Sequence, residues 1–258
     1  MTTAMHWCSR QVTDMAMAMD EVTPQQSVTQ FQLLTWCSPA YPIGAFSYSH
    51  GMEWAVERGT VTTLAGLLDF VGAVLERGGG WVDAVLFAQA WRAAQQPSAT
   101  WNAHARSQLR GIAELAAAFR ATAETALESR QQGAAFLSVT LKAWPHPRLA
   151  DFAADMRGLP IAHSVAVAVT CAAHGIGLSL AIQAFIQSIG ANLVSAGARL
   201  IPLGQTAAQI AIARLAPIVA ATAARAVTTE LDELGTCTPG LELCSMRHET
   251  QYTRLFRS

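Results

Sequence analysis

The side chains that could carry out chemistry are scattered along this chain of 258 residues. His248-Glu249 begins like the HExxH zinc motif, but the residue four positions after His248 is Tyr252, so the second ligand is missing. The sequence has no GxxxxGK[ST] loop for nucleotide phosphates and no GxSxG nucleophile elbow. It therefore predicts no catalytic residue, no metal site, no cofactor and no enzymatic activity.

Cysteine and histidine leave one weaker alternative. The five cysteines lack the CxxC spacing of zinc and redox sites and are expected to be reduced thiols, as in cytoplasmic proteins. Cys237, Cys244 and His248 offer soft ligands close together in sequence, but their spacing matches no common metal motif. His163 and His174 lie in an apolar region, where a single histidine is expected to be a hydrogen-bonded core residue.

The C-terminal segment SMRHETQYTRLFRS, residues 245–258, differs in composition from the alanine-rich chain before it. Arginine and tyrosine carry much of the binding energy at protein interfaces. If this segment is helical, Tyr252, Leu255 and Phe256 share one face. We therefore expect residues 228–258 to form a partner-docking segment that is flexible until the partner binds.

A second unusual segment spans residues 38–54. Pro39 and Pro42 favour extended backbone before them, Gly44 permits a turn, and Phe46 and Tyr48 follow among serines. One interpretation is a rigid loop that caps the next helix and buries its aromatics. The other is a preorganised surface for a partner.

Helical spacing recurs along the rest of the chain, and no segment shows strand alternation. The sequence predicts an all-α, single-domain bundle of about nine or ten helices over residues 27–227, after a disordered leader over residues 1–26. Helices are expected over 64–75 and from residue 81, followed by one long helix from an N-cap at Ser98 to about Arg130. Breaks are expected at 144–147, 175–177 and 202–205. A capping box over 206–209 begins a helix that runs to about Ala226 and bends at Pro217, and a short turn follows over 229–235.

Composition limits the partners. The net charge is −1 and there is no basic run, so nucleic acid is not expected. Charged residues make up only 14% of the chain, and none occurs from Gly158 to Ala198. A membrane protein using residues 160–198 is therefore an alternative. Recurring His, Gln and Asn in this stretch favour tightly packed helices of a soluble core.

Three segments together resemble the UreF family of urease accessory proteins. The first is Ser38-Pro39 with Pro42, Gly44, FSYS at 46–49, Gly51, Glu53 and Trp54; the second is NLVSA at 192–196 with PLGQT at 202–206; the third is the segment 245–258. Arg130-Gln131 with Gly133 resembles a further family element. The departures are Ala45, where a second glycine is common, and Ala166-Val167 in place of a tyrosine-glycine pair.

This resemblance implies an all-α, cytoplasmic, non-catalytic homodimer that acts as a chaperone or adaptor in urease maturation. It implies binding to UreD (also called UreH), recruitment or modulation of the GTPase UreG, and nickel delivery to apo-urease through the accessory complex. A direct nickel carrier using Cys237, Cys244 and His248 is the alternative. The residues that the resemblance assigns to partner binding are Pro39, Pro42, Gly44, Phe46, Ser47, Tyr48, Glu53, Gln205, Arg247, His248, Glu249, Tyr252, Arg254, Leu255, Phe256 and Arg257.

Overall fold

The computed structural model describes residues 23–95 and 101–258, and in these ranges the chain is all-α, as predicted. Two short 3₁₀ turns, η1 (Ala45–Ser47) and η2 (Leu231–Glu233), accompany the α-helices. The helices are α1 (Pro24–Trp36), α2 (Met52–Glu57), α3 (Leu64–Glu76), α4 (Gly79–Ala94), α5 (Ala103–Ala118), α6 (Ala123–Ala143), α7 (Pro147–Asp155), α8 (His163–Ala173), α9 (Leu178–Leu200), α10 (Gln205–Thr228) and α11 (Pro239–His248).

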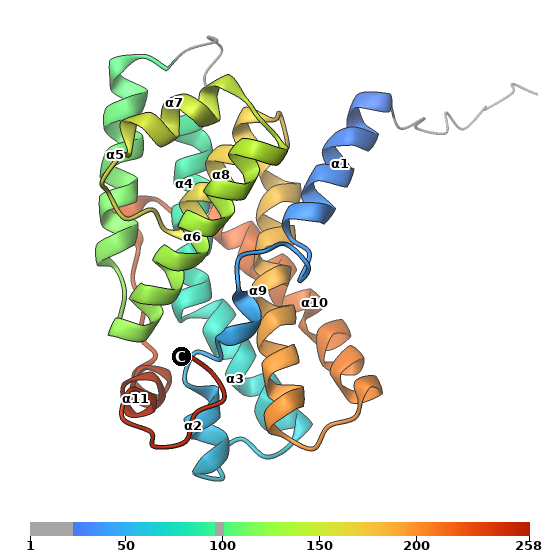
Figure 1. Ribbon diagram of the computed structural model, residues 1–258. Helices are drawn as coiled ribbons and strands as arrows, with labels where there is room; N and C mark the ends of the chain where they lie inside the picture. The colour runs from blue at the N-terminus through green and yellow to red at the C-terminus, as the bar shows by residue number, and fades with distance from the viewer. Residues whose placement is uncertain (1–22, 96–100) are drawn as a thin grey trace, which may run out of the picture.

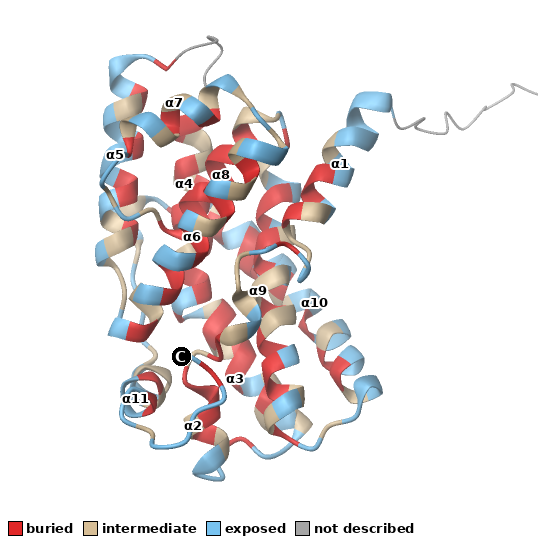
Figure 2. Ribbon diagram, in the orientation of Figure 1, coloured by how far each residue is buried: buried red, intermediate tan, exposed pale blue. Residues whose placement is uncertain are grey.

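The core surrounds α8, whose residues 164–172 are all buried. Helices α4, α6 and α9 pack around it, and α10 packs against α9, α3 and α4. Small residues allow these close approaches. A Cβ atom on Gly133 of α6, for example, would lie 2.8 Å from the backbone carbon of Ala162, at the start of α8. Buried positions face the middle of the bundle on every central helix, whereas α1 projects from the body with its first turns exposed (Figure 1, Figure 2).

Most of the predicted breaks are confirmed. Helix α3 ends at Glu76 and α4 begins at Gly79, α6 ends before the 144–147 break, and Gly175–Gly177 separate α8 from α9. The short turn predicted over 229–235 is η2. Proline and glycine mark these positions because they interrupt backbone hydrogen bonding or permit unusual dihedral angles.

The single helix predicted from Ser98 to Arg130 is wrong in its described part, because residues 119–122 separate α5 from α6. Thr122 caps the new helix through its side chain, and Arg120 leaves the helical path to pair with Asp83. The predicted N-cap, Ser98, lies outside the described residues.

Two predicted boundaries also differ. The capping box at 206–209 is wrong, because α10 begins at Gln205 after Gly204 and has no side-chain cap. The helix contains Pro217 and continues to Thr228. In the predicted leader, Thr23 and Gln26 form a capping box that begins α1, so residues 23–26 are structured; residues 1–22 lie outside the described ranges.

Helices α9 and α10 are long and apolar enough to cross a membrane, by length and composition. The stretch 160–198 proposed for a membrane span is divided into α8, which has 11 residues, and most of α9. A helix of that length is too short to span a bilayer, which needs about 20 residues. Helices α9 and α10 pack against each other and against α3 and α4, and these contacts bury 39% and 33% of their most apolar stretches.

Candidate partner-docking site

The two unusual segments of the sequence meet at one end of the bundle, where α2 lies beside α11 (Figure 1). Gly51 permits this contact, because its φ is +77° and a Cβ atom there would lie 2.7 Å from the backbone carbonyl carbon of Cys244. Thr122 and Ser245 join α6 to α11 through their hydroxyl groups, 2.8 Å apart. The C-terminal segment is therefore packed against the body and is not a free tail.

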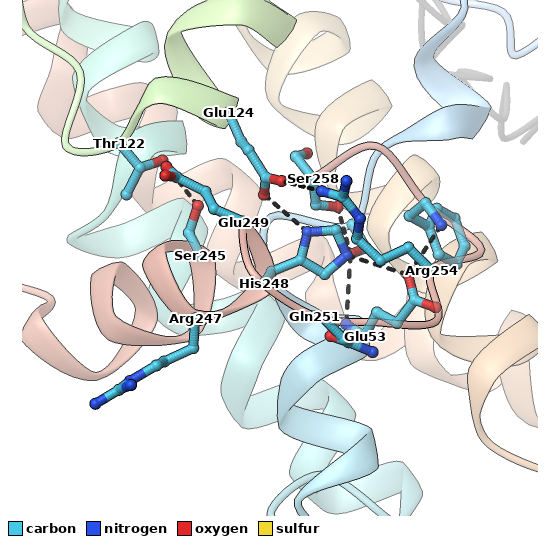
Figure 3. A network of polar contacts seen from close by, with 12 residues as sticks. Glu53, Thr122, Glu124, Ser245, Arg247, His248, Glu249, Gln251, Arg254 and Ser258 are labelled. Carbon is cyan, nitrogen blue, oxygen red and sulfur yellow. Dashed lines mark hydrogen bonds and ion pairs between the residues drawn. The ribbon is translucent and has the colours of Figure 1, made fainter.

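His248 is fully buried at the centre of this contact. Its Nδ1 lies 2.8 Å from Glu124 Oε2 and its Nε2 lies 3.2 Å from Glu53 Oε2 (Figure 3). Carboxylate oxygens are hydrogen-bond acceptors, so the ring has an acceptor on each side. Burial raises the pKa of Glu124, and His248 and Arg254 oppose that rise.

Glu53 also holds the chain that follows α11. Its Oε1 accepts the backbone N–H of Leu255 at 2.6 Å, and its Oε2 accepts that of Phe256 at 2.8 Å. Phe256 is buried, with the Arg199 guanidinium 4.5 Å from its ring centroid. Arg199 also donates to the carbonyl of Phe46 at 2.8 Å, so it links α9 to both segments.

The last two residues are bound by the loop before α2. Arg257 donates its N–H to the carbonyl of Ser47 at 2.7 Å. The carbonyl of Ser258 accepts from the backbone N–H of Ser49 at 2.6 Å and from its hydroxyl at 2.5 Å. The Ser258 hydroxyl donates to Glu128 of α6 at 3.1 Å, so the segment ends in the body.

Tyr48 and His50 extend this network into the bundle. Tyr48 donates to Gln131 at 2.5 Å, and burial raises the pKa of its hydroxyl. His50 lies 3.2 Å from Glu128, in the left-handed backbone region with φ of 56°. Burial opposes protonation of His50, but the Glu128 carboxylate outweighs it and raises the histidine pKa.

The sequence-predicted site residues separate into two groups. Glu53, Tyr48, His248 and Phe256 are buried in the contact, and Ser47 holds Arg257 through its carbonyl. The exposed ones are Pro39, Pro42, Phe46, Gln205, Arg247, Glu249, Tyr252, Arg254, Leu255 and Arg257, while Gly44 is partly buried. Figure 3 shows Arg247 pointing away from the network.

The predicted helical face of Tyr252, Leu255 and Phe256 is wrong. Helix α11 ends at His248, and the residues after it follow an irregular path along the body. Tyr252 is fully exposed and Leu255 is 66% exposed, whereas Phe256 is 3% exposed. Neighbouring side chains therefore face opposite directions, because the Glu53 carboxylate binds the backbone between them.

Sequence reasoning missed the body residues that hold the segment. Glu124 and Glu128 lie on α6 among ordinary polar residues, and no local motif marks them. Gln131 belongs to the family element at 130–133, but it was not assigned to the site. Arg199 had a signal, because it is the first charged residue after the uncharged stretch that begins at Gly158. A lone charge at the end of such a stretch indicates a specific partner.

A cavity of about 470 Å³ lies between α11 and the helices α4, α6 and α9. Its wall includes Tyr48 and His50 from the loop, Ser245 from α11 and His163 from α8. Burial lowers the pKa of His163 to about 4, and its Nε2 has no hydrogen-bond partner among the described residues. Burial alone would raise the pKa of Asp83, on the same wall, but its ion pair with Arg120 outweighs this and lowers that pKa.

The alternative metal site is not assembled. Both ring nitrogens of His248 face carboxylates, Cys237 is exposed and Cys244 is partly buried. Within residues 23–95 and 101–258, no group of three or more His, Cys, Asp or Glu side chains could hold a metal ion. Cys237, Cys244 and His248 thus do not present an open set of ligands.

Comparisons with known proteins agree with this geometry. The model of the UreF family matches residues 61–216, which is more than half of the chain. The chain belongs to the UreF family. It is 49% identical over 234 residues to the urease accessory protein UreF of Rhodopseudomonas palustris strain TIE-1, covering 91% of this chain and 94% of that protein. It is 46% identical over 242 residues to the urease accessory protein UreF of Granulibacter bethesdensis, covering 93% and 99%.

UreF membership confirms the resemblance that the sequence motifs indicated. The family match does not include residues 38–54 or 245–258, whereas the alignment with the Granulibacter protein spans 242 residues, too many to exclude both segments. The UreF relatives named above are accessory proteins by name.

Proposed function

We propose that this protein is a cytoplasmic, non-catalytic adaptor in urease maturation. In this proposal it binds UreD (UreH), recruits or modulates the GTPase UreG, and so supports nickel insertion into apo-urease. UreF family membership carries the pathway assignment. The absence of a catalytic motif in the sequence is consistent with an adaptor role.

The docking surface in this proposal is the outer side of α11 and the segment after it. Leu243 and Met246 are each 49% exposed on α11, and Tyr252 and Leu255 are exposed beyond it. Exposed tyrosine and aliphatic side chains on a fixed backbone suit a protein interface, because little conformational entropy is lost when they bind. Arg247, which follows Met246 on α11, is exposed and can donate several hydrogen bonds to a partner.

We also propose that the chain forms a homodimer. In the most apolar stretches of α9 and α10, fewer than half of the residues are buried in one chain. The groove between them is lined mainly by small and apolar side chains, including Leu180, Ala184, Ala213 and Ala216. A second copy would cover this face, and the molecular mass in light scattering tests the assignment.

The main experiment is co-purification with UreD and then with UreG. Deleting residues 245–258 should leave the helical signal in circular dichroism and abolish capture of both partners. A double change, Tyr252→Ala with Leu255→Ser, should weaken UreD binding at least about tenfold because it removes two exposed anchors. The matched control is Val28→Ser on α1, which is 50% exposed and lies far from α11 (Figure 1).

Unchanged capture of UreD by the deleted chain would overturn the docking assignment. Equal losses for the double variant and for Val28→Ser would contradict a specific surface. Nickel carriage by the chain itself would instead appear as stoichiometric nickel binding that is lost on changing Cys237 and Cys244.

A further inference from the structure

We propose that Glu53 and His248 are positioning residues, which fix the path of residues 249–258 and thereby present Tyr252 and Leu255 to the partner. This inference rests on the proposed function, because it assigns a role to buried residues behind the proposed docking surface. It also revises the contact role that the family resemblance gave to both residues.

Glu53 is engaged by this chain and shielded from a partner. Its side chain is 9% exposed, and its two oxygens accept from the Leu255 N–H, the Phe256 N–H and the His248 ring. Glu53 lies in the first turn of α2, so its own position is fixed by a helix of the body. It acts on the partner surface only through the backbone that it binds.

The two consecutive N–H groups set the directions of two side chains. Leu255 and Phe256 both donate to Glu53, and the Leu255 side chain is exposed while the Phe256 side chain is buried. Phe256 then packs under Arg199. Without the Glu53 carboxylate, the backbone of Leu255 and Phe256 has no acceptor that keeps the Leu255 side chain facing outward.

His248 fixes the other end of the same stretch. Its ring stands between Glu53 of α2 and Glu124 of α6, and Arg254 donates to the second oxygen of Glu124 at 3.0 Å (Figure 3). The His248 ring thus joins the two carboxylates, and Arg254 pairs with one of them. Tyr252 lies between these anchors and makes no buried contact of its own, since it is fully exposed.

The separation into positioning and contact residues can be measured with two readouts. Hydrogen exchange of the peptide covering 249–258 reports its position, and binding of purified UreD reports contact. In Glu53→Gln, exchange in this peptide should quicken at least about tenfold and UreD should bind at least about tenfold more weakly, because a charged acceptor of three donors is lost.

Tyr252→Ala gives the opposite pattern, with weaker UreD binding and exchange equal to the parent. Phe256→Ala should behave like Glu53→Gln, although it too is an aromatic of the same segment. Glu53→Asp keeps the carboxylate and should restore binding to within about threefold of the parent. Glu114→Gln, at an exposed position on α5, is the surface control and should change neither readout.

Parental exchange in Glu53→Gln would overturn the proposal, and so would parental UreD binding in that variant. If UreD fails to bind even the parent chain, the proposed function falls while exchange still decides whether Glu53 holds the segment. The positioning role is supported if the peptide covering 249–258 exchanges more slowly in the parent than in Glu53→Gln and Phe256→Ala. Peptides from α4 and α8 must exchange alike in the parent and the two variants.

Discussion

The helical body and the C-terminal segment are held by different forces. In the body, α4, α8 and α9 bury alanine, valine and phenylalanine against one another with almost no exposed core surface. The segment after α11 is held mainly by hydrogen bonds and ion pairs to Glu53, Glu124 and Glu128, with Phe256 as its one buried aromatic.

Because of this difference, the stability of the body and the proposed docking of the segment should respond to different substitutions. Apolar burial contributes over the whole bundle, so the body should remain folded when the segment detaches. Charge-assisted hydrogen bonds depend on geometry, so single substitutions should release the segment. Variants of the body and of the segment should therefore give distinct patterns of unfolding and binding.

The largest expected effect is in the body. Gly133→Ala places a methyl group 2.8 Å from the Ala162 backbone carbon, where α6 crosses the start of α8. The helices must move apart, and we expect the free energy of unfolding to fall by about 3 kcal/mol. Urea denaturation measures it. Gly111→Ala on α5, with open space around its Cβ position, is the control and should be neutral or stabilising.

The next effect is at the junction of body and segment. Gly51→Ala and Gly59→Ala both put alanine at a positive φ, +77° and +72°, which costs about 1 kcal/mol each. Only Gly51→Ala also meets the backbone of α11. We expect it alone to quicken hydrogen exchange in residues 249–258 and to weaken UreD binding. Equal behaviour of the two variants would contradict the close packing of α2 on α11.

The smallest effect is the pH dependence of stability at His163. The unfolded chain takes up a proton near the ordinary pKa of 6.5, whereas the folded pKa is about 4. The stability that neutral His163 contributes is therefore fully present above the unfolded pKa and is lost as the pH falls towards the folded pKa. Lowering the pH from about 7 to about 5.5 should reduce the free energy of unfolding by about 1 kcal/mol.

His163→Gln should flatten that part of the unfolding curve, measured by thermal melts across the pH range. His104→Gln, at an exposed position on α5, is the matched control. An unchanged slope in His163→Gln would show that the ring is not held neutral in the body.

Local signals predicted the fold well. Spacing of Leu64, Leu67 and Leu68 predicted α3, and glycine at 175 and 177 predicted the break before α9. The break at 119–122 escaped because it depends on Arg120 reaching Asp83 on another helix. The predicted capping box at 206–209 was wrong because α10 already begins at Gln205, and its N-cap residue, Gly204, has no side chain that could form a cap.

The candidate site was predicted in part. The sequence singled out the segments 38–54 and 245–258 separately, by composition. Their contact depends on pairs such as Glu53 with His248, which are 195 positions apart, and no local pattern reports such a pair. The irregular path of Tyr252 and Leu255 follows from the same distant contacts, so helical spacing could not describe it.

The hydrogen bond between Ser49 and Ser258 joins residues 209 positions apart. During synthesis the loop before α2 leaves the ribosome long before the residues that complete this bond. The body can fold in the meantime, before Glu53 and Arg199 make their contacts with Phe256. A chain that lacks residues 245–258 would thus fold without the proposed docking surface, so partner capture would select chains that carry this segment over chains that lack it.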